Sequence, residues 1–161
     1  GSAETIVELR PGSGGTTRAI LQAMAQRAKL LSIEINPHLH TLVSRIADSR
    51  LIAHRGDANG LREILSMCRL YAPEVLISGI PFSTMSRCSG SQILEAISSV
   101  LAPGGRFVAY QVSKQVATLC RPYLGQERMA MELLNIPPMR VYQWEKRKTG
   151  TEPQSGARSS L

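Results

Sequence analysis

The first feature of the chain that could do chemistry is a glycine-rich turn directly after an apolar run. In VELRPGSG, residues 7–14, Glu8 precedes Gly12 and Gly14. Glycines let the backbone turn tightly and let a ligand approach it closely, as in nucleotide-binding sites. A glycine pattern of this length also occurs in ordinary turns, so its meaning depends on the residues that follow.

Two acids lie where a nucleoside bound at that turn would need them. Glu34 ends a second apolar run, 20 residues after Gly14, where an acid can accept hydrogen bonds from both ribose hydroxyls. Asp57 follows a third apolar run, in RGDA, and could accept from an adenine amine. The two acids therefore predict that the ligand contains an adenosine. Residues 15–17 lack the spacing that presents a helix to a pyrophosphate, which argues against NAD, and the missing Gly-Lys-Ser/Thr argues against ATP.

Strands and helices must alternate along the chain to position these residues. Strands are predicted at 5–9, 30–35, 50–54, 74–80 and 106–112, and helices at 15–28, from 37 onward with Asn36 as N-cap, at 59–69, at 90–101 and near 114–123. A final pair of strands is expected near 127–134 and 139–146. This order predicts an α/β fold, a doubly wound, mostly parallel seven-stranded sheet with a C-terminal antiparallel strand pair. Ligands of such sheets bind beyond the carboxyl ends of the strands, where all of these motifs fall.

The composition fits one folded domain. The chain has 161 residues, of which 43% are hydrophobic and 19% charged, and this is not a disordered composition. We expect the domain to occupy residues 1–148, with a disordered tail at 149–161.

The three cysteines, Cys68, Cys88 and Cys120, are odd in number and widely spaced. Their number and spacing argue against a disulfide framework and a metal site, and favour a reducing compartment.

The net charge of +7 is concentrated toward the C-terminus. Residues 114–148 hold seven Lys or Arg against three Glu. A basic segment suits an anionic partner, such as a phosphate, a lipid headgroup or a nucleic acid. The alternative is a solvated surface that keeps the protein soluble.

The motifs together resemble a known family. VELRPGSG, LLSIEINP, RGDA, SGIPF and LAPGGRFV occur in the order and at the spacing of the class I S-adenosylmethionine-dependent methyltransferases. The resemblance covers nearly the whole chain and implies the Rossmann-like methyltransferase fold. Within that family, VELRPGSGGTTRAIL, SGIPF and NIPPMRVYQWEKR are most similar to the bacterial phospholipid N-methyltransferases, relatives of the rRNA adenine dimethylases.

The resemblance implies S-adenosylmethionine as the cofactor and a role for each motif. Glu8 would hold the cofactor's amino group, Gly12 and Gly14 would pack under its methionine part, Glu34 would bind the ribose, and Asp57 with Ala58 would bind the adenine. Ser78, Gly79, Ile80 and Pro81 would lie beside the methyl group, where their carbonyls, aided by the Ser78 hydroxyl, would orient the acceptor amine.

The implied activity is N-methylation of a phospholipid headgroup amine resembling phosphatidylethanolamine. Such an enzyme would be cytoplasmic, peripheral at the inner membrane, and bound weakly to anionic lipid. Two alternatives are an impaired or non-catalytic module with this fold and an RNA methyltransferase. Charge favours RNA, but Ser78 argues against it, because adenine N-methyltransferases carry Asn or Asp at that position.

The chain departs from the family at two places. Arg10 replaces the first glycine of the turn. We expect Arg10 to adopt a negative φ, with its guanidinium in solvent. The alternatives are that its side chain fills the pocket or pairs with the cofactor carboxylate. Five residues precede Ile6, so we also expect the family's N-terminal lid segment to be lacking.

Overall fold

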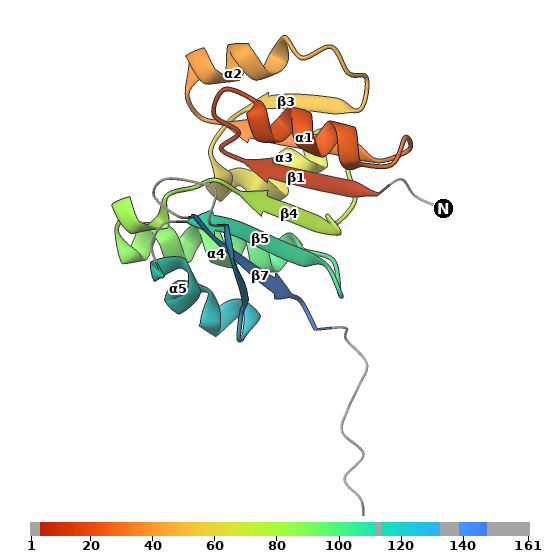
Figure 1. Cartoon of the computed structure of the whole chain (residues 1–161). Coiled ribbons are helices and arrows are strands. Elements are labelled where there is room, and N and C mark those ends of the chain that lie inside the picture. Colours follow the sequence, from red (N-terminus) through yellow and green to blue (C-terminus); the bar gives the residue numbers. More distant parts are fainter. Residues whose placement is uncertain (1–3, 112–113, 133–138, 148–161) are drawn as a thin grey trace, which may run out of the picture.

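Seven strands form one sheet in the computed structural model, which describes residues 4–111, 114–132 and 139–147 (Figure 1). The strands are β1 (Thr5–Leu9), β2 (Lys29–Glu34), β3 (Leu51–Arg55), β4 (Val75–Ser78), β5 (Arg106–Gln111), β6 (Arg128–Glu132) and β7 (Met139–Glu145). The helices are α1 (Gly15–Ala23), α2 (Pro37–Ser44), α3 (Leu61–Met67), α4 (Arg87–Val100) and α5 (Gln115–Leu124), with short 3₁₀ turns η1 (Ala58–Gly60) and η2 (Phe82–Thr84).

The sheet order is β3-β2-β1-β4-β5-β7-β6. Strands β1 to β5 pair in parallel, while β7 pairs antiparallel with both β5 and β6. The predicted doubly wound, mostly parallel sheet with an antiparallel C-terminal pair is therefore confirmed. Strands β1 to β3 are added toward one edge of the sheet and β4 and β5 toward the other, so the strand order reverses between β1 and β4. The crevice at such a switch point is where these folds bind ligands.

The side chains of β1 alternate between the two faces of the sheet and so pack into two different layers. Val7 and Leu9 belong to the main core, which they share with α3, α4 and α5. Ile6 belongs to a smaller cluster on the other face, with Leu21 of α1. Successive side chains of a strand point to opposite faces, so Glu8 lies on the same face as Ile6, under α1. One strand thus supplies both the core and a buried acid.

Two helix boundaries differ from the prediction by three residues or more. Helix α1 ends at Ala23 rather than near residue 28, because the chain must turn there to bring Lys29 beside β1, where its N–H donates to the Glu4 carbonyl over 2.8 Å. Helix α4 begins at Arg87 rather than 90, because the Ser86 hydroxyl accepts the Ser89 N–H over 3.1 Å and forms an N-cap.

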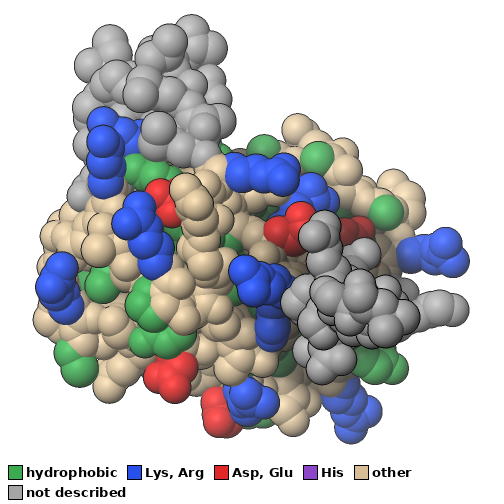
Figure 2. Space-filling view, turned by 90° about the horizontal axis from the view of Figure 1, so that it is seen from below, with side chains coloured by type: hydrophobic (Ala, Val, Ile, Leu, Met, Phe, Trp, Pro, Cys, Tyr) green, Lys and Arg blue, Asp and Glu red, His purple; other side chains and the backbone are tan. Residues whose placement is uncertain are grey.

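The basic C-terminal segment is partly structural. Lys146 Nζ donates to the carbonyls of Ser98 and Leu101 over 2.7 Å each, and so satisfies the end of α4. Arg121 pairs with Glu127 over 3.6 Å. Figure 2 shows Lys and Arg side chains spread over one face, with Asp and Glu among them, rather than gathered in a single patch.

The predicted tail at 149–161 lies outside the described residues. In the part of the chain that the structure describes, no helix combines the length and apolar character needed to cross a membrane.

Candidate functional site

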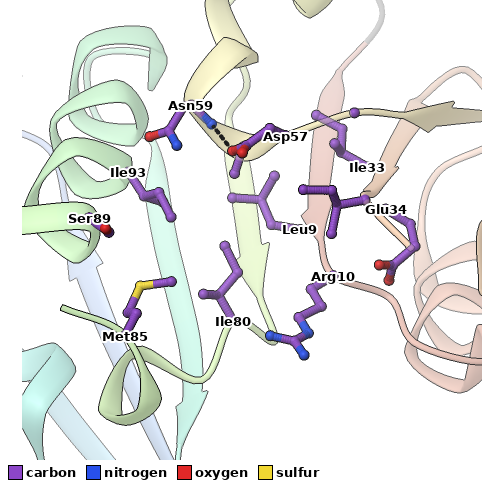
Figure 3. A pocket seen from close by; sticks show the side chains of 13 residues that line it. Leu9, Arg10, Ile33, Glu34, Asp57, Asn59, Ile80, Met85, Ser89 and Ile93 are labelled. Carbon is purple, nitrogen blue, oxygen red and sulfur yellow. Dashed lines mark hydrogen bonds between the residues drawn. The ribbon is translucent and has the colours of Figure 1, made fainter. Parts of the chain in front are cut away.

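A pocket of about 260 Å³ opens at the carboxyl ends of β1 to β4. Its walls come from the ends of β1 and β2, the turn after β3, the loop after β4, and the start of α4 (Figure 3). The lining residues are Leu9, Arg10, Ile33, Glu34, Ile35, Gly56, Asp57, Ala58, Asn59, Ile80, Met85, Ser89 and Ile93. The site thus lies at the predicted edge of the sheet, at its switch point.

Glu34 is the buried acid of this pocket. Its side chain is 2% exposed, and its two oxygens accept from different backbone segments. Oε1 accepts the Asn36 N–H over 2.9 Å, and Oε2 accepts the Gly12 N–H over 3.3 Å. The carboxylate therefore holds the glycine turn to the end of β2, and it faces the pocket in a position to accept from hydroxyl groups.

The turn after β3 contributes the second acid. Asp57 lies at the pocket wall with Ala58 and Asn59. Its Oδ1 accepts the Asn59 N–H over 2.8 Å, so Asp57 also serves as the N-cap of η1. Asp57 can both cap η1 and bind a ligand, because a carboxylate has two oxygens and can cap a turn with one of them.

The glycine turn leaves space beside the pocket. Gly12 has φ of 60° and Gly14 has φ of 90°, conformations that other residues adopt at a cost. A Cβ added at Gly12 would meet nothing within 4 Å, whereas one at Gly14 would lie 3.0 Å from Ile46 Cδ1. Gly14 thus packs closely against Ile46, which follows α2, and Gly12 presents bare backbone to open space. Neither glycine lines the pocket itself.

The expectation for the backbone of Arg10 was wrong. Its φ is 59°, in the left-handed region that glycine prefers, and not negative. The residue is exposed, and it lines the mouth of the pocket. The turn therefore keeps the conformation of a glycine turn, although an arginine occupies the position.

Glu8 is the center of a buried polar cluster under α1. Its Oε2 accepts hydrogen bonds from Thr17 Oγ1 over 2.6 Å and from Ser32 Oγ over 2.8 Å. Its Oε1 is buried without a hydrogen-bond partner in the described part of the chain. Burial raises the pKa of Glu8, the two hydroxyls lower it, and the charge of Glu34 raises it further. Glu8 does not line the pocket.

This buried acid predicts a pH-dependent stability. Because the folded chain raises the pKa of Glu8 above its ordinary value of 4.5, the folded state binds more protons than the unfolded state just above that pH. The contribution of Glu8 to stability should therefore fall as pH rises from about 4.5, by about 1.4 kcal/mol per unit of pKa shift. Glu8→Gln, which keeps an acceptor for Thr17 and Ser32, should gain stability relative to the wild type over that range. Urea unfolding of both proteins between pH 4 and 8 measures this difference, and a difference that does not change with pH would contradict it.

The loop after β4 lies against the glycine turn. A Cβ added at Gly79 would lie 2.8 Å from Tyr110 Oη and 2.9 Å from the Arg10 carbonyl, so only glycine fits there. Ile80 lines the pocket, but Gly79 and Pro81 do not. Tyr110 Oη lies 3.4 Å from Thr16 Oγ1, and burial raises the pKa of Tyr110, so the phenol keeps its proton at neutral pH.

Ser78 ends β4, and its place beside the methyl group stays a prediction. Its side chain is fully buried and does not line the pocket. Its hydroxyl accepts the Ile80 N–H over 3.2 Å and thereby fixes the bend after β4. The hydroxyl therefore helps to shape the loop after β4.

Several residues of the site were missed from the sequence. Ile35 is 61% exposed on the pocket wall, an unusual position for an isoleucine, and it follows the acid directly in LLSIEI. Met85, Ser89 and Ile93 form the opposite wall. Ser89 and Ile93 are four residues apart on α4, a helical spacing that a start of the helix at Arg87 would have revealed, whereas Met85 precedes the helix. Thr17 and Ser32 had no signal, because only the fold brings them to Glu8.

Comparisons with known proteins agree with this geometry. No protein-family model matches the chain. Over 144 residues it is 24% identical to an ornithine lipid N-methyltransferase of Singulisphaera acidiphila. The aligned region covers 88% of this chain and 75% of that protein.

Solved structures of methyltransferases superpose on the chain. The N-methyltransferase NodS from Bradyrhizobium japonicum, in complex with S-adenosyl-L-homocysteine, matches with a TM-score of 0.70 and 13% identity over 91% of this chain and 79% of its own. Human N-acetylserotonin methyltransferase, in complex with SAM, gives a TM-score of 0.64 at 12% identity, over 89% of this chain and 48% of that enzyme. At such identities the likeness shows that the folds are the same.

Proposed function

We propose that this chain, which has the fold of the S-adenosylmethionine-dependent methyltransferases, binds S-adenosylmethionine in the pocket and transfers its methyl group to an amine. The observation that carries the proposal is the pairing of a buried acid and an exposed isoleucine at the end of β2. Glu34 is 2% exposed and Ile35 is 61% exposed, yet both line the same pocket. An acid that accepts from hydroxyls, beside an apolar surface open to a flat ring, suits an adenosine.

The residues present fit the rest of the cofactor. Glu34 would bind the ribose hydroxyls, Asp57 and Ala58 would lie at the adenine, and Ile35 would cover one face of the ring. The open space at Gly12 would admit the methionine part close to the backbone. Glu8 Oε1, which is buried under the turn without a hydrogen-bond partner in the described part of the chain, leaves an acceptor that suits the ammonium group of such a ligand, reached through a bridging water.

The chemistry asks mainly for positioning. The cofactor supplies an electrophilic methyl on a sulfonium; as the acceptor nitrogen bonds to that carbon, the carbon–sulfur bond breaks, its electrons stay on sulfur, and the methylated amine loses a proton to solvent. The chain must hold an uncharged amine in line with the methyl group at about 3 Å. We assign this role to the backbone carbonyls of residues 78–81, whose bend is fixed by Ser78.

We propose a lipid headgroup as the source of the amine, with a peripheral position at the cytoplasmic side of the inner membrane. The support is the 24% identity to an ornithine lipid N-methyltransferase and the excess of Lys and Arg, which favours anionic surfaces. Charge alone would equally favour RNA, so the test must include both.

Transfer of a labelled methyl group tests this proposal. The protein is incubated with methyl-labelled S-adenosylmethionine and with vesicles of phosphatidylethanolamine, vesicles of ornithine lipid, or ribosomal RNA. We expect label in a lipid fraction, with at least a tenfold smaller rate for Glu34→Gln. Label in RNA alone would replace the lipid acceptor by a nucleic acid, and cofactor binding without transfer to any acceptor would favour the non-catalytic alternative.

A further inference from the structure

We propose that Arg10 is an anion-binding residue of this pocket, whose guanidinium holds a carboxylate or phosphate group of a bound ligand. The inference rests on the proposed function, which places a ligand at the ends of β1 and β2. It concerns the position at which the chain departs most clearly from the glycine turn of its family.

The backbone does not explain an arginine at this position. Arg10 has φ of 59°, and among the described residues Arg69, with φ of 54°, is its single non-glycine counterpart. A side chain in this region has a conformational cost that glycine avoids. Strained residues of this kind cluster at binding sites. What the arginine adds is its charged side chain.

The side chain lies where a ligand would reach it. Arg10 is exposed, and it is the single cation among the residues that line the pocket. Its guanidinium forms no hydrogen bond or ion pair within the described ranges, 4–111, 114–132 and 139–147. Figure 3 shows its head turned away from the Glu34 carboxylate, toward the side of the pocket formed by Ile80. Its donors are therefore free for a ligand.

The base of the side chain is held in place. The Arg10 N–H donates to the Ile33 carbonyl over 2.9 Å, and its carbonyl packs so closely against Gly79 that a Cβ there would lie 2.9 Å away. The pocket thus has an acid, Glu34, toward β2 and a cation, on a held backbone, toward the loop after β4. A ligand with hydroxyls at one end and an anionic group at the other matches this order.

Two ligands could supply the anionic group. One is the cofactor, whose amino-acid part ends in a carboxylate, and the other is the acceptor, through the phosphate or carboxylate of a headgroup. Both present two oxygens to which a guanidinium can donate in parallel. The experiment separates them by removing the carboxylate from the nucleoside.

The test compares Arg10→Gln with the wild type by calorimetry, using S-adenosylhomocysteine and 5′-methylthioadenosine, which lacks the amino-acid part. If Arg10 holds the cofactor carboxylate, the variant should bind S-adenosylhomocysteine about tenfold more weakly and methylthioadenosine equally well. If it holds the acceptor, both nucleosides should bind as before, and phosphoethanolamine added to the methylthioadenosine complex should bind about tenfold more weakly.

Arg69→Gln is the matched control, because Arg69 is also an exposed arginine at positive φ but lies outside the pocket wall. It should change none of these affinities. Equal affinity of Arg10→Gln for all three probes, or tighter binding, would overturn the anion-binding role alone. A wild type that binds neither nucleoside would overturn the proposed function, and this inference with it.

Discussion

Replacing Glu34 with glutamine should lower the affinity for S-adenosylhomocysteine by about tenfold to a hundredfold. The carboxylate is 2% exposed and lies at the end of β2, where it can accept from two ribose hydroxyls. Hydrogen bonds to a charged acceptor contribute about 1.5–3 kcal/mol, and glutamine offers one neutral acceptor in its place. Calorimetric titration of both proteins measures the loss.

The variant should keep its fold, because a glutamine oxygen can still accept the Asn36 N–H that Glu34 Oε1 accepts over 2.9 Å, and the change gives up only the longer bond of 3.3 Å from the Gly12 N–H. Glu95→Gln is the matched control: it removes a charge from an exposed position of α4 that does not line this pocket. If the wild type binds S-adenosylhomocysteine and Glu34→Gln binds it with the same affinity, Glu34 does not contact the ribose.

Gly79→Ala should cost both stability and methyl transfer. Its Cβ would lie 2.8 Å from Tyr110 Oη and 2.9 Å from the Arg10 carbonyl, so the loop after β4 and the glycine turn must move apart. Overpacking of this kind costs about 1–3 kcal/mol of unfolding free energy. Misplacing a reacting group by about 1 Å costs about a hundredfold in rate, and the transfer rate should fall by a comparable factor.

Two further variants separate this clash from a general effect of losing a glycine. Gly15→Ala places a methyl group in open space at the start of α1 and should leave the protein as stable as before or slightly more so. Gly79→Ala combined with Tyr110→Phe removes one of the two clashes and should recover part of the stability. A Gly79→Ala protein with wild-type activity would show that the loop position does not control transfer.

The parallel pairing of the strands and the edge that carries the pocket could be predicted from the sequence. TIVEL, LLSIEI and EVLISGI are apolar runs of strand length, and the helices between them force parallel pairing. Parallel strands bring their carboxyl ends to one edge, so Glu34, Asp57, Ala58 and Ile80 had to lie near one another, and all four line the pocket. The spacing of the residues and the topology of the sheet therefore suffice to predict which residues meet at the pocket.

Side-chain direction could not be predicted in the same way. Ser78 ends β4 beside the pocket, but strand alternation turns it into the interior, where it accepts the Ile80 N–H. Glu8 points under α1 for the same reason. Arg10 adopts positive φ because the turn between β1 and α1 is set by its surroundings, among them the contact with Gly79 and the hydrogen bond to Ile33. Strand alternation accounts for the directions of Ser78 and Glu8, whereas the φ of Arg10 depends on contacts between segments distant in sequence.

We expect the pocket at the ends of β1 to β4 to bind the adenosine of S-adenosylmethionine. A calorimetric titration of the wild-type protein with S-adenosylhomocysteine tests it most directly. We predict saturable binding at one site per chain, weakened at least tenfold in Glu34→Gln and unchanged in Glu95→Gln. The absence of saturable binding at millimolar ligand, or binding that Glu34→Gln leaves intact, would contradict the claim.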